Sequence, residues 1–263
     1  YILEKNSKLG GRARQFSAKG FTFDMGPSWY WMPDVFEKYF KDFGKDINDY
    51  IKLKRLDPSY KVFFDDEVID IPADYNSLKD LLDSMEEGSG DKLDEFLAQA
   101  EKKYKVGIEN LVYKPGLSLS EFIDKDTISG IFELDVFKSM YNHIRKYFKN
   151  EKIIKLLEFP VLFLGATPKN TPALYSLMNY ADIKLGTWYP EGGMYKVVEA
   201  MINLAKEKGV KFYSGEDVRK FSYVNKNISH VITSKKTFDV DYVVCSGDYH
   251  HFDQNILEEK FRN

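Results

Sequence analysis

The residues best suited to chemistry lie close together near the start of the sequence. An acid closes a short apolar run, two tandem glycines follow, and two arginines stand just beyond them: Glu4, Gly10, Gly11, Arg12 and Arg14. An apolar run that ends on an acid is typical of the second strand of a dinucleotide-binding βαβ unit, where the acid accepts hydrogen bonds from a ribose. Glycines let the backbone pass close to a ligand because they lack a Cβ atom. Guanidinium groups beside them suit a pyrophosphate.

The spacing of these residues resembles the glycine–arginine motif of FAD-dependent amine-oxidase-like flavoproteins. After Glu4 come five residues, then Gly-Gly-Arg-x-Arg, and then the pattern G-x-x-F-D-x-G-P, which ends on Gly26-Pro27. Two later segments resemble bacterial carotenoid (phytoene) desaturases in particular. Residues 186–194 are similar to a G-x-W-[FY]-P-x-G-G segment, and residues 243–248 to a V-V-x-x-A-D turn, with Gly247 where alanine is usual. A glycine-rich hairpin with a solvated basic loop is the alternative interpretation of the first stretch.

The resemblance implies FAD as the cofactor and a long apolar polyene as the substrate. The residues that it places against FAD are Glu4, Gly10, Gly11, Arg12, Arg14, Gly26, Pro27, Val218, Gly247 and Asp248. The residues that it places against the substrate are Trp29, Tyr30, Phe163, Leu164, Trp188 and Tyr189, for several of which core packing is the alternative. No amino-acid side chain accepts a hydride, so the flavin carries that step and the catalytic side chains stay unknown.

The implied fold is a mixed α/β one, in which a Rossmann-like FAD-binding domain contains an inserted substrate domain of strands and helices. The first part of the FAD-binding domain is expected at 1–44, the substrate domain at 45–190 and the return to the FAD-binding domain at 191–263. No G-x-G-x-x-G precedes Glu4. The sequence is therefore expected to be an internal fragment of a longer protein, without the C-terminal flavin segment and inactive by itself.

The pattern of apolar residues predicts the elements of the middle of the chain. Pro33 is expected to start a helix, and Asp74 to start another. Alternation over residues 61–72 predicts a hairpin with an acidic turn. Residues 159–168 are expected to fold inward as the end of an element and a loop, because Pro160 breaks any helix that runs through them.

The last third of the sequence reads as rich in strands. Residues 218–233 are expected to form a hairpin, and residues 240–245 a buried strand. The single cysteine, Cys245, is expected to be a buried apolar residue, and one cysteine excludes a disulfide within the chain. His250 and His251 are adjacent on an extended segment, so they point to opposite faces and no metal is expected.

The composition of the chain limits the classes of partner that it can bind. Acids and bases are mixed and the net charge is −3, which leaves no electrostatic footprint for nucleic acid. No apolar run is long enough to span a bilayer. An apolar stripe over residues 132–148 with basic flanks is consistent with peripheral membrane association from the cytoplasm, although a solvated core helix gives the same pattern.

The alternatives in function are an amine or porphyrinogen oxidase and a non-catalytic binding protein, and the oligomeric state is left open.

Overall fold

A computed structural model describes residues 1–114, 117–118 and 137–262. The chain divides into two compact units. Unit 1 combines Tyr1–Ser28 with Gly192–Asn263, and unit 2 is Trp29–Glu191. Unit 1 thus brings the two ends of the chain into one body, as expected for a domain interrupted by an insertion. The assignment of 1–44, 45–190 and 191–263 to cofactor and substrate roles stays a prediction.

Unit 1 is built on strands from both ends of the chain. β1 (Ile2–Glu4) pairs in parallel with β8 (Phe212–Ser214), with Glu4 opposite Ser214. A separate antiparallel sheet has the order β11-β10-β9 and comprises β9 (Val218–Val224), β10 (Asn227–Thr233) and β11 (Thr237–Asp239). The predicted hairpin at 218–233 is therefore confirmed. The unit is completed by β2 (Gln15–Ala18), β3 (Phe21–Asp24), α8 (Tyr195–Glu207) and α9 (Tyr249–His251).

The small core of unit 1 joins two of its sheets, β1-β8 and β11-β10-β9. Phe221, Val231 and Phe238 are buried, and Leu3 of β1 and Tyr213 of β8 pack against them. Successive side chains of a strand point to opposite faces, so alternate residues of β9 and β10 supply this core while their neighbours face water. The core lies beneath the strands that end beside Glu4.

The predicted buried strand at 240–245 is wrong. These residues form no strand, and Tyr242 and Val244 are 91% and 92% exposed. Cys245 is exposed as well. A strand needs a neighbour that satisfies its backbone N–H and C=O groups, and no described strand pairs with this segment.

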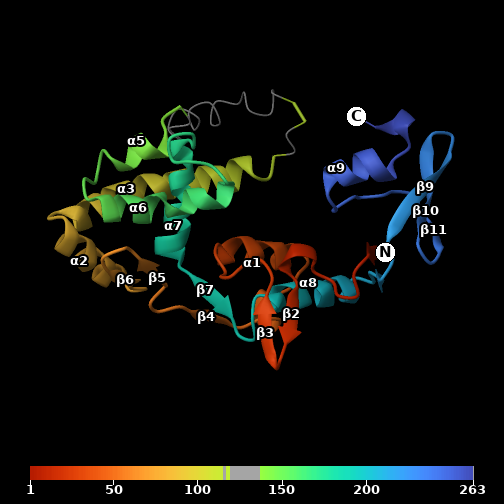
Figure 1. Cartoon of the computed structure of the whole chain (residues 1–263), viewed down its shortest axis with the longest axis horizontal. Helices are drawn as coiled ribbons and strands as arrows, with labels where there is room; N and C mark the ends of the chain where they lie inside the picture. Colours follow the sequence, from red (N-terminus) through yellow and green to blue (C-terminus); the bar gives the residue numbers. More distant parts are fainter. Residues whose placement is uncertain (115–116, 119–136, 263) are drawn as a thin grey trace. The chain divides into compact units, whose positions relative to one another are not determined.

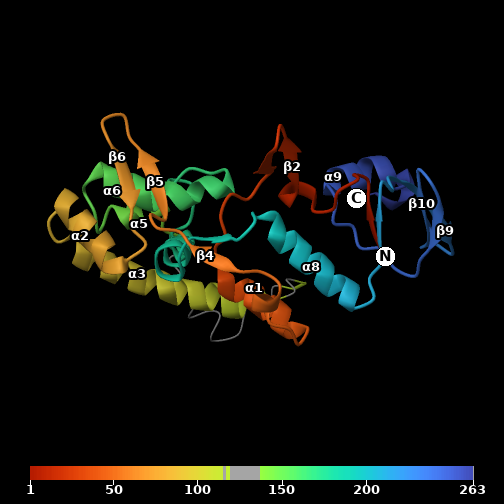
Figure 2. The same ribbon diagram turned by 90° about the horizontal axis from the view of Figure 1, so that it is seen from below.

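Unit 2 is mainly helical. The α-helices among its described residues are α1 (Pro33–Asp42), α2 (Tyr75–Met85), α3 (Ser89–Lys105), α5 (Met140–Ile144), α6 (Glu151–Glu158) and α7 (Leu177–Tyr180). The starts at Pro33 and after Asp74 are as predicted, and the carboxylate of Asp74 accepts the backbone N–H of Ser77 as an N-cap. Figures 1 and 2 show α3, α5 and α6 side by side, and the hairpin of β5 (Tyr60–Phe63) and β6 (Val68–Ile71) lies against them.

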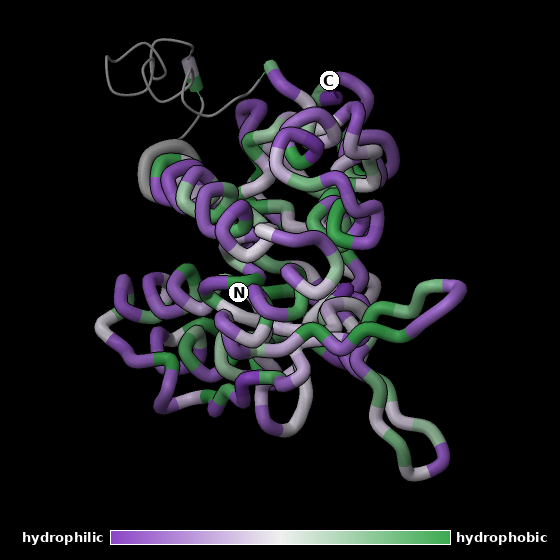
Figure 3. Tube along the Cα trace, turned by 90° about the vertical axis from the view of Figure 1, so that its left-hand side faces the viewer, coloured by the Kyte–Doolittle hydropathy of each residue, from purple (hydrophilic) through white to green (hydrophobic). Residues whose placement is uncertain are grey.

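Two short antiparallel pairs supply the strands in the part of unit 2 that the structure describes. β5 (Tyr60–Phe63) pairs with β6 (Val68–Ile71), which confirms the predicted hairpin. Figure 3 shows how apolar strand residues give way to hydrophilic ones at its acidic turn. β4 (Leu53–Arg55) pairs with β7 (Trp188–Pro190). A bridge between Tyr30 and Trp188 continues this second pair.

Two sequence interpretations change in unit 2. The described part of the stripe at 132–148 is core, since Met140, Ile144 and Phe148 are at most 1% exposed; the positions from 132 to 136 lie outside the described residues. The segment after α6 does not fold wholly inward. It continues as a 3-10 helix (Phe159–Leu164), because proline is tolerated in a first helical turn, and this turn exposes the side chains of Leu162, Phe163 and Leu164.

Candidate functional site

The glycine pair of unit 1 has one packed side and one open side. A Cβ atom at Gly10 would lie 3.1 Å from both the Tyr195 ring and the Val198 side chain, so Gly10 seats the loop on α8. The Tyr195 hydroxyl also donates to the carbonyl of Leu9 at 3.2 Å. Gly11 has a φ of +52°, and no atom lies within 4 Å of its Cβ direction. The backbone at Gly11 is therefore open to a ligand.

The segment around Gly26 forms the back of the same loop. The backbone N–H of Met25 donates to the Arg14 carbonyl at 2.9 Å. A Cβ atom at Gly26 would lie only 2.3 Å from the Arg12 carbonyl oxygen, so only glycine fits. Pro27, the next residue, is exposed. In the described parts of the chain, neither Arg12 nor Arg14 has a carboxylate partner, and both remain available for an anion.

Glu4 stands where β1 ends, beside the turn that follows β8. One carboxylate oxygen, Oε1, accepts from the backbone and side-chain nitrogens of Asn6 at 2.8 and 2.7 Å. Oε2 has no partner among the residues that the structure describes. The Glu4 carbonyl accepts the N–H of Glu216 at 2.9 Å. Val218 follows two residues after Glu216 in the chain.

These groups fit FAD. The open glycine backbone, the two arginines and the acid at a strand end are the kinds of group that suit a pyrophosphate and a ribose hydroxyl. Two groups of contacts are seen in unit 1. Gly26 and Met25 contact the loop at Arg12 and Arg14, and Glu4 contacts Glu216, which lies two residues before Val218. Gly247 and Asp248 are exposed, and the Asp248 carboxylate caps α9 by accepting the N–H of His251 at 2.7 Å. Their predicted flavin role stays a prediction.

Sequence reasoning missed the structural part that Asp24 plays in this site. Its two carboxylate oxygens accept the N–H groups of Met194 and Tyr195 at 3.0 and 3.3 Å. These N–H groups belong to the first turn of α8, which has no partner for them inside the helix. The F-D-x-G-P motif and the segment after Gly193 are therefore joined by a helix cap.

Unit 2 carries a cluster of aromatic side chains from two distant segments, which we term the aromatic cluster. Its members are Trp29, Trp31, Phe159 and Phe163. The ring centroid of Phe163 lies 5.5 Å from that of Trp29 and 5.4 Å from that of Trp31, both in edge-to-face geometry. Phe163 is 51% exposed, and Leu164 beside it is exposed too. The cluster therefore presents an apolar, aromatic surface that is open to a ligand.

Not all of the predicted substrate residues join this cluster. Tyr30 and Trp188 exchange both backbone hydrogen bonds of their bridge, at 2.8 and 3.0 Å, so their side chains share one sheet face. Tyr30 is buried against Phe36. The Trp188 indole donates to the Leu185 carbonyl at 2.9 Å. Alternation along the strand puts Trp29, Trp31 and Tyr189 on the other face.

A buried polar network lies next to the cluster, and no sequence motif marked it. The Trp31 indole N–H donates to the Thr187 hydroxyl at 2.8 Å, and that hydroxyl donates to Asp182 Oδ1 at 2.7 Å. The Tyr60 hydroxyl donates to Asp182 Oδ2 at 2.7 Å. Burial raises the pKa of the Asp182 carboxyl, while the hydrogen bonds from Tyr60 and Thr187 and the charge of Arg55 oppose that rise.

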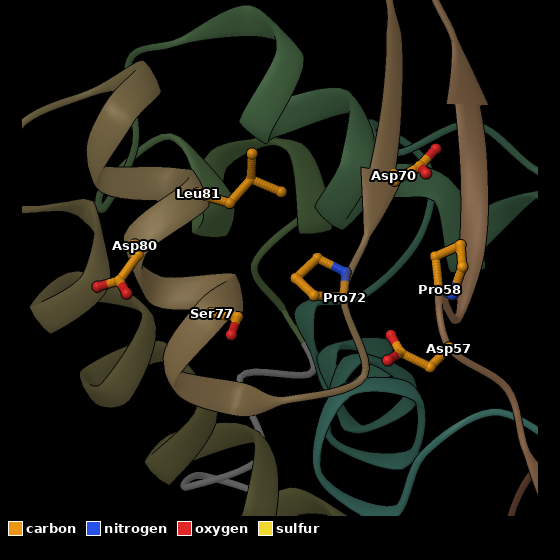
Figure 4. Close-up of a pocket in the computed structure, with 7 residues that line it drawn as sticks. All are labelled: Asp57, Pro58, Asp70, Pro72, Ser77, Asp80 and Leu81. Carbon is orange, nitrogen blue, oxygen red and sulfur yellow. The ribbon is translucent and has the colours of Figure 1, made fainter.

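A surface hollow between the β5–β6 hairpin and α2 does not suit an apolar substrate. Figure 4 shows its lining, which comprises Asp57, Pro58, Asp70, Pro72, Ser77, Asp80 and Leu81. Three of these side chains are carboxylates, which an apolar chain would have to desolvate.

The described residues contain no group of histidine, cysteine and acidic side chains that could hold a metal ion, and no helix among them is long and apolar enough to cross a membrane.

Comparisons with known proteins identify relatives of this chain. Carotenoid 3,4-desaturase of Haloarcula japonica is 36% identical over 99% of this chain and 53% of its own length. A 4,4'-diapophytoene desaturase of Staphylococcus aureus is 33% identical over 99% of this chain and 50% of its own length. The chain thus spans about half the length of the curated relatives it matches. A solved Pyrococcus furiosus protein shares the fold, with a TM-score of 0.58 at 16% identity over 100% of this chain and 56% of that one.

The family model for flavin-containing amine oxidoreductases matches residues 1–262. This match includes the Gly-Gly-Arg-x-Arg loop, the aromatic cluster and the segment that ends in Asp248. It confirms the α/β flavoprotein fold and FAD as the cofactor of the family. The chain belongs to the family of flavin-containing amine oxidoreductases.

Proposed function

We propose that this chain forms part of an FAD-dependent desaturase that acts on a carotenoid precursor. One observation carries the proposal: relatives that match almost the whole chain at 30–36% identity are named carotenoid or phytoene desaturases. The desaturase names of these relatives favour this function over the amine and porphyrinogen oxidase alternatives. The proposed reaction needs a loop that binds an anion and a surface that binds an apolar chain. The open backbone at Gly11 in unit 1 and the aromatic cluster in unit 2 support the proposal.

Unit 1 supplies the cofactor contacts. When bound, FAD accepts the hydride that the polyene loses, a step that no side chain can perform. Arg12 and Arg14 offer donors to the pyrophosphate, and the backbone at Gly11 lets it approach closely. Glu4 Oε2 accepts a ribose hydroxyl. Gly10, seated on α8, keeps this loop in place.

Unit 2 supplies the surface for the polyene. A polyene has no hydrogen-bonding groups, so it binds by burial of apolar area at about 25 cal/mol per Å². The aromatic cluster offers ring faces and edges, and its open member, Phe163, contacts both tryptophans. A polyene on these rings excludes water from the reacting carbons and is held in one orientation, which is the protein's share of the catalysis.

We also propose that the protein works at a membrane surface, from which it takes its lipid-soluble substrate. The side chains of Leu162, Phe163 and Leu164 are 68%, 51% and 43% exposed on the turn beside the aromatic cluster. Apolar side chains on one exposed turn can enter the outer part of a bilayer. Flotation of the protein with anionic liposomes tests this point, and a protein that stays in the soluble fraction contradicts it.

Replacing Phe163 with aspartate tests the substrate site. The new carboxylate stands against two indole rings, and we expect at least about a tenfold loss of desaturation, or about 1.4 kcal/mol. Bound FAD, measured by its visible absorbance, should stay stoichiometric. The matched control is Phe63→Asp, since Phe63 is a 76% exposed phenylalanine of the same unit outside the cluster. Loss of FAD together with activity would contradict the substrate assignment.

A further inference from the structure

The buried network around Asp182 is used by neither the proposed cofactor site nor the proposed substrate surface. Asp182 and Thr187 are 5% and 2% exposed, so neither can reach a ligand directly. Asp182 lies in a single π-helical turn (Ala181–Leu185), a distortion that is frequent at functional sites. Burial of a carboxylate costs free energy unless its oxygens accept hydrogen bonds. We therefore ask what role the buried Asp182 has.

The direction of the hydrogen bonds in this network is determined by chemistry. An indole N–H can only donate, so the Thr187 oxygen accepts from Trp31. The Thr187 proton is then directed at Asp182 Oδ1. Tyr60 donates to the other oxygen, Oδ2. Asp182 is thus the common acceptor at which two chains of donors end.

Both chains of donors begin on rings that belong to or touch the aromatic cluster. Trp31 lies 5.4 Å from Phe163, and Tyr60 lies 5.7 Å from Phe159, measured between ring centroids. Trp31 comes from the segment before α1, Tyr60 from β5, and Asp182 from the turn after α7. One carboxylate therefore ties the segment that carries Trp31 to the strand whose Tyr60 ring contacts Phe159.

Arg55 supplies a positive charge near the buried Asp182 carboxylate, and its side chain lies against the backbone at Gly186. Its guanidinium lies over the Trp188 ring at 5.4 Å and donates to the Leu185 carbonyl at 3.2 Å. A Cβ atom at Gly186 would be 1.6 Å from Arg55 Nη1, so the glycine makes room for the guanidinium. The positive charge favours the ionised form of Asp182 and acts against the cost of its burial.

We propose that Asp182 is a positioning residue that, through Thr187 and Tyr60, holds the rings of the aromatic cluster in the arrangement that binds the polyene. This inference rests on the proposed function, because it assigns a purpose to the same surface. Asp182 does not touch the substrate. Its effect is on the orientation of Trp31, which cannot keep its hydrogen bond if Thr187 loses its hydroxyl.

The test replaces Thr187 with valine, which keeps the shape and removes the hydroxyl, in protein expressed from the complete reading frame that contains this chain. Thr187→Ser restores the hydroxyl. Thr171→Val is the matched control, because Thr171 is also 2% exposed but donates to the Thr167 carbonyl. The first measurement is the ¹⁵N–¹H resonance of the Trp31 indole, assigned with Trp31→Phe. The second is the KM, and separately the kcat, for phytoene.

We expect Thr187→Val to shift the Trp31 resonance and to raise KM about tenfold, equivalent to about 1.4 kcal/mol, with bound FAD unchanged. Thr187→Ser and Thr171→Val should resemble the wild type. If the valine variant does not fold, the same two measurements are made on Asp182→Asn, which keeps one acceptor oxygen. A similar shift of the Trp31 resonance and a similar increase in KM are expected. An unchanged resonance, or a shifted resonance with an unchanged KM, overturns the positioning role. If the wild type neither binds nor converts phytoene, the proposed function itself fails, which the resonance alone would not reveal.

Discussion

Gly26 offers the sharpest test of the cofactor loop, because its replacement by alanine creates one defined clash. The new Cβ atom would lie 2.3 Å from the Arg12 carbonyl oxygen, and Cβ atoms essentially never lie closer than 3.0 Å to another heavy atom. The two backbone segments must therefore separate by at least about 0.7 Å. Overpacking of this kind costs about 1–3 kcal/mol. The strain falls on the loop that presents both arginines.

FAD affinity is the quantity to measure, by titrating the apoprotein expressed from the complete reading frame and following flavin absorbance. If half of this strain, about 0.5–1.5 kcal/mol, appears in binding, FAD should bind about two to thirteen times more weakly, since about 1.4 kcal/mol is a factor of ten. Gly20→Ala is the matched control. Gly20 has a φ of +82° and open space in its Cβ direction, so its replacement strains the hairpin turn without approaching the loop.

Two results would refute this reasoning. If Gly26→Ala binds FAD as tightly as the wild type and melts at the same temperature, the loop tolerates separation and does not present the arginines in a defined geometry. If Gly20→Ala weakens FAD binding equally, the hairpin as a whole, and not the contact between Gly26 and Arg12, supports the cofactor.

Two further predictions concern the supports of the site. Asp24→Ala removes the cap of α8 and should lower the free energy of unfolding by about 1–2 kcal/mol, measured by urea denaturation; Asp24→Asn should recover part of the loss, and an unaffected midpoint would show that water replaces the cap. Glu86 accepts from Lys92 Nζ and from the N–H groups of Lys149 and Asn150, at 2.6–2.8 Å. Burial opposes ionisation, but these donors prevail and lower the pKa of Glu86 below its ordinary value of 4.5. A lowered folded-state pKa contributes stability above about pH 4.5 that is lost as the pH falls through the folded value, so Glu86→Gln should flatten the acid limb of a stability–pH curve; an identical limb would rule out this contribution.

The cofactor loop could be predicted from sequence because its requirements are local. Few residue types can replace a glycine that has a positive φ or that faces a carbonyl oxygen. The same holds for an acid at the end of a strand. The hairpins at 61–72 and 218–233 were predictable for the same reason, since alternation and turn residues act over a few positions. The strand at 240–245 was not, because pairing depends on a neighbour that alternation cannot reveal.

The aromatic cluster shows where local reasoning stops. The sequence indicated that Trp29 and Phe163 could line a ligand site, but also Tyr30 and Trp188, because aromatic residues near turns look alike in one dimension. The bridge between Tyr30 and Trp188 decides which face each ring takes. A change of one residue in strand register moves every side chain to the opposite face, and register is a property of the folded pair.

By itself the sequence determined the family and the cofactor class, and it marked the loop that we propose for FAD, because residues that bind a pyrophosphate must occur at short, rigid spacings. Only the tertiary structure decided which aromatic rings meet and what holds them. Trp31, Tyr60 and Asp182 are separated by up to 151 positions in the chain (182 − 31), and nothing in their neighbours marks them as partners. Their hydrogen bonds exist because folding buries them together, and a buried donor must find an acceptor wherever the chain places one.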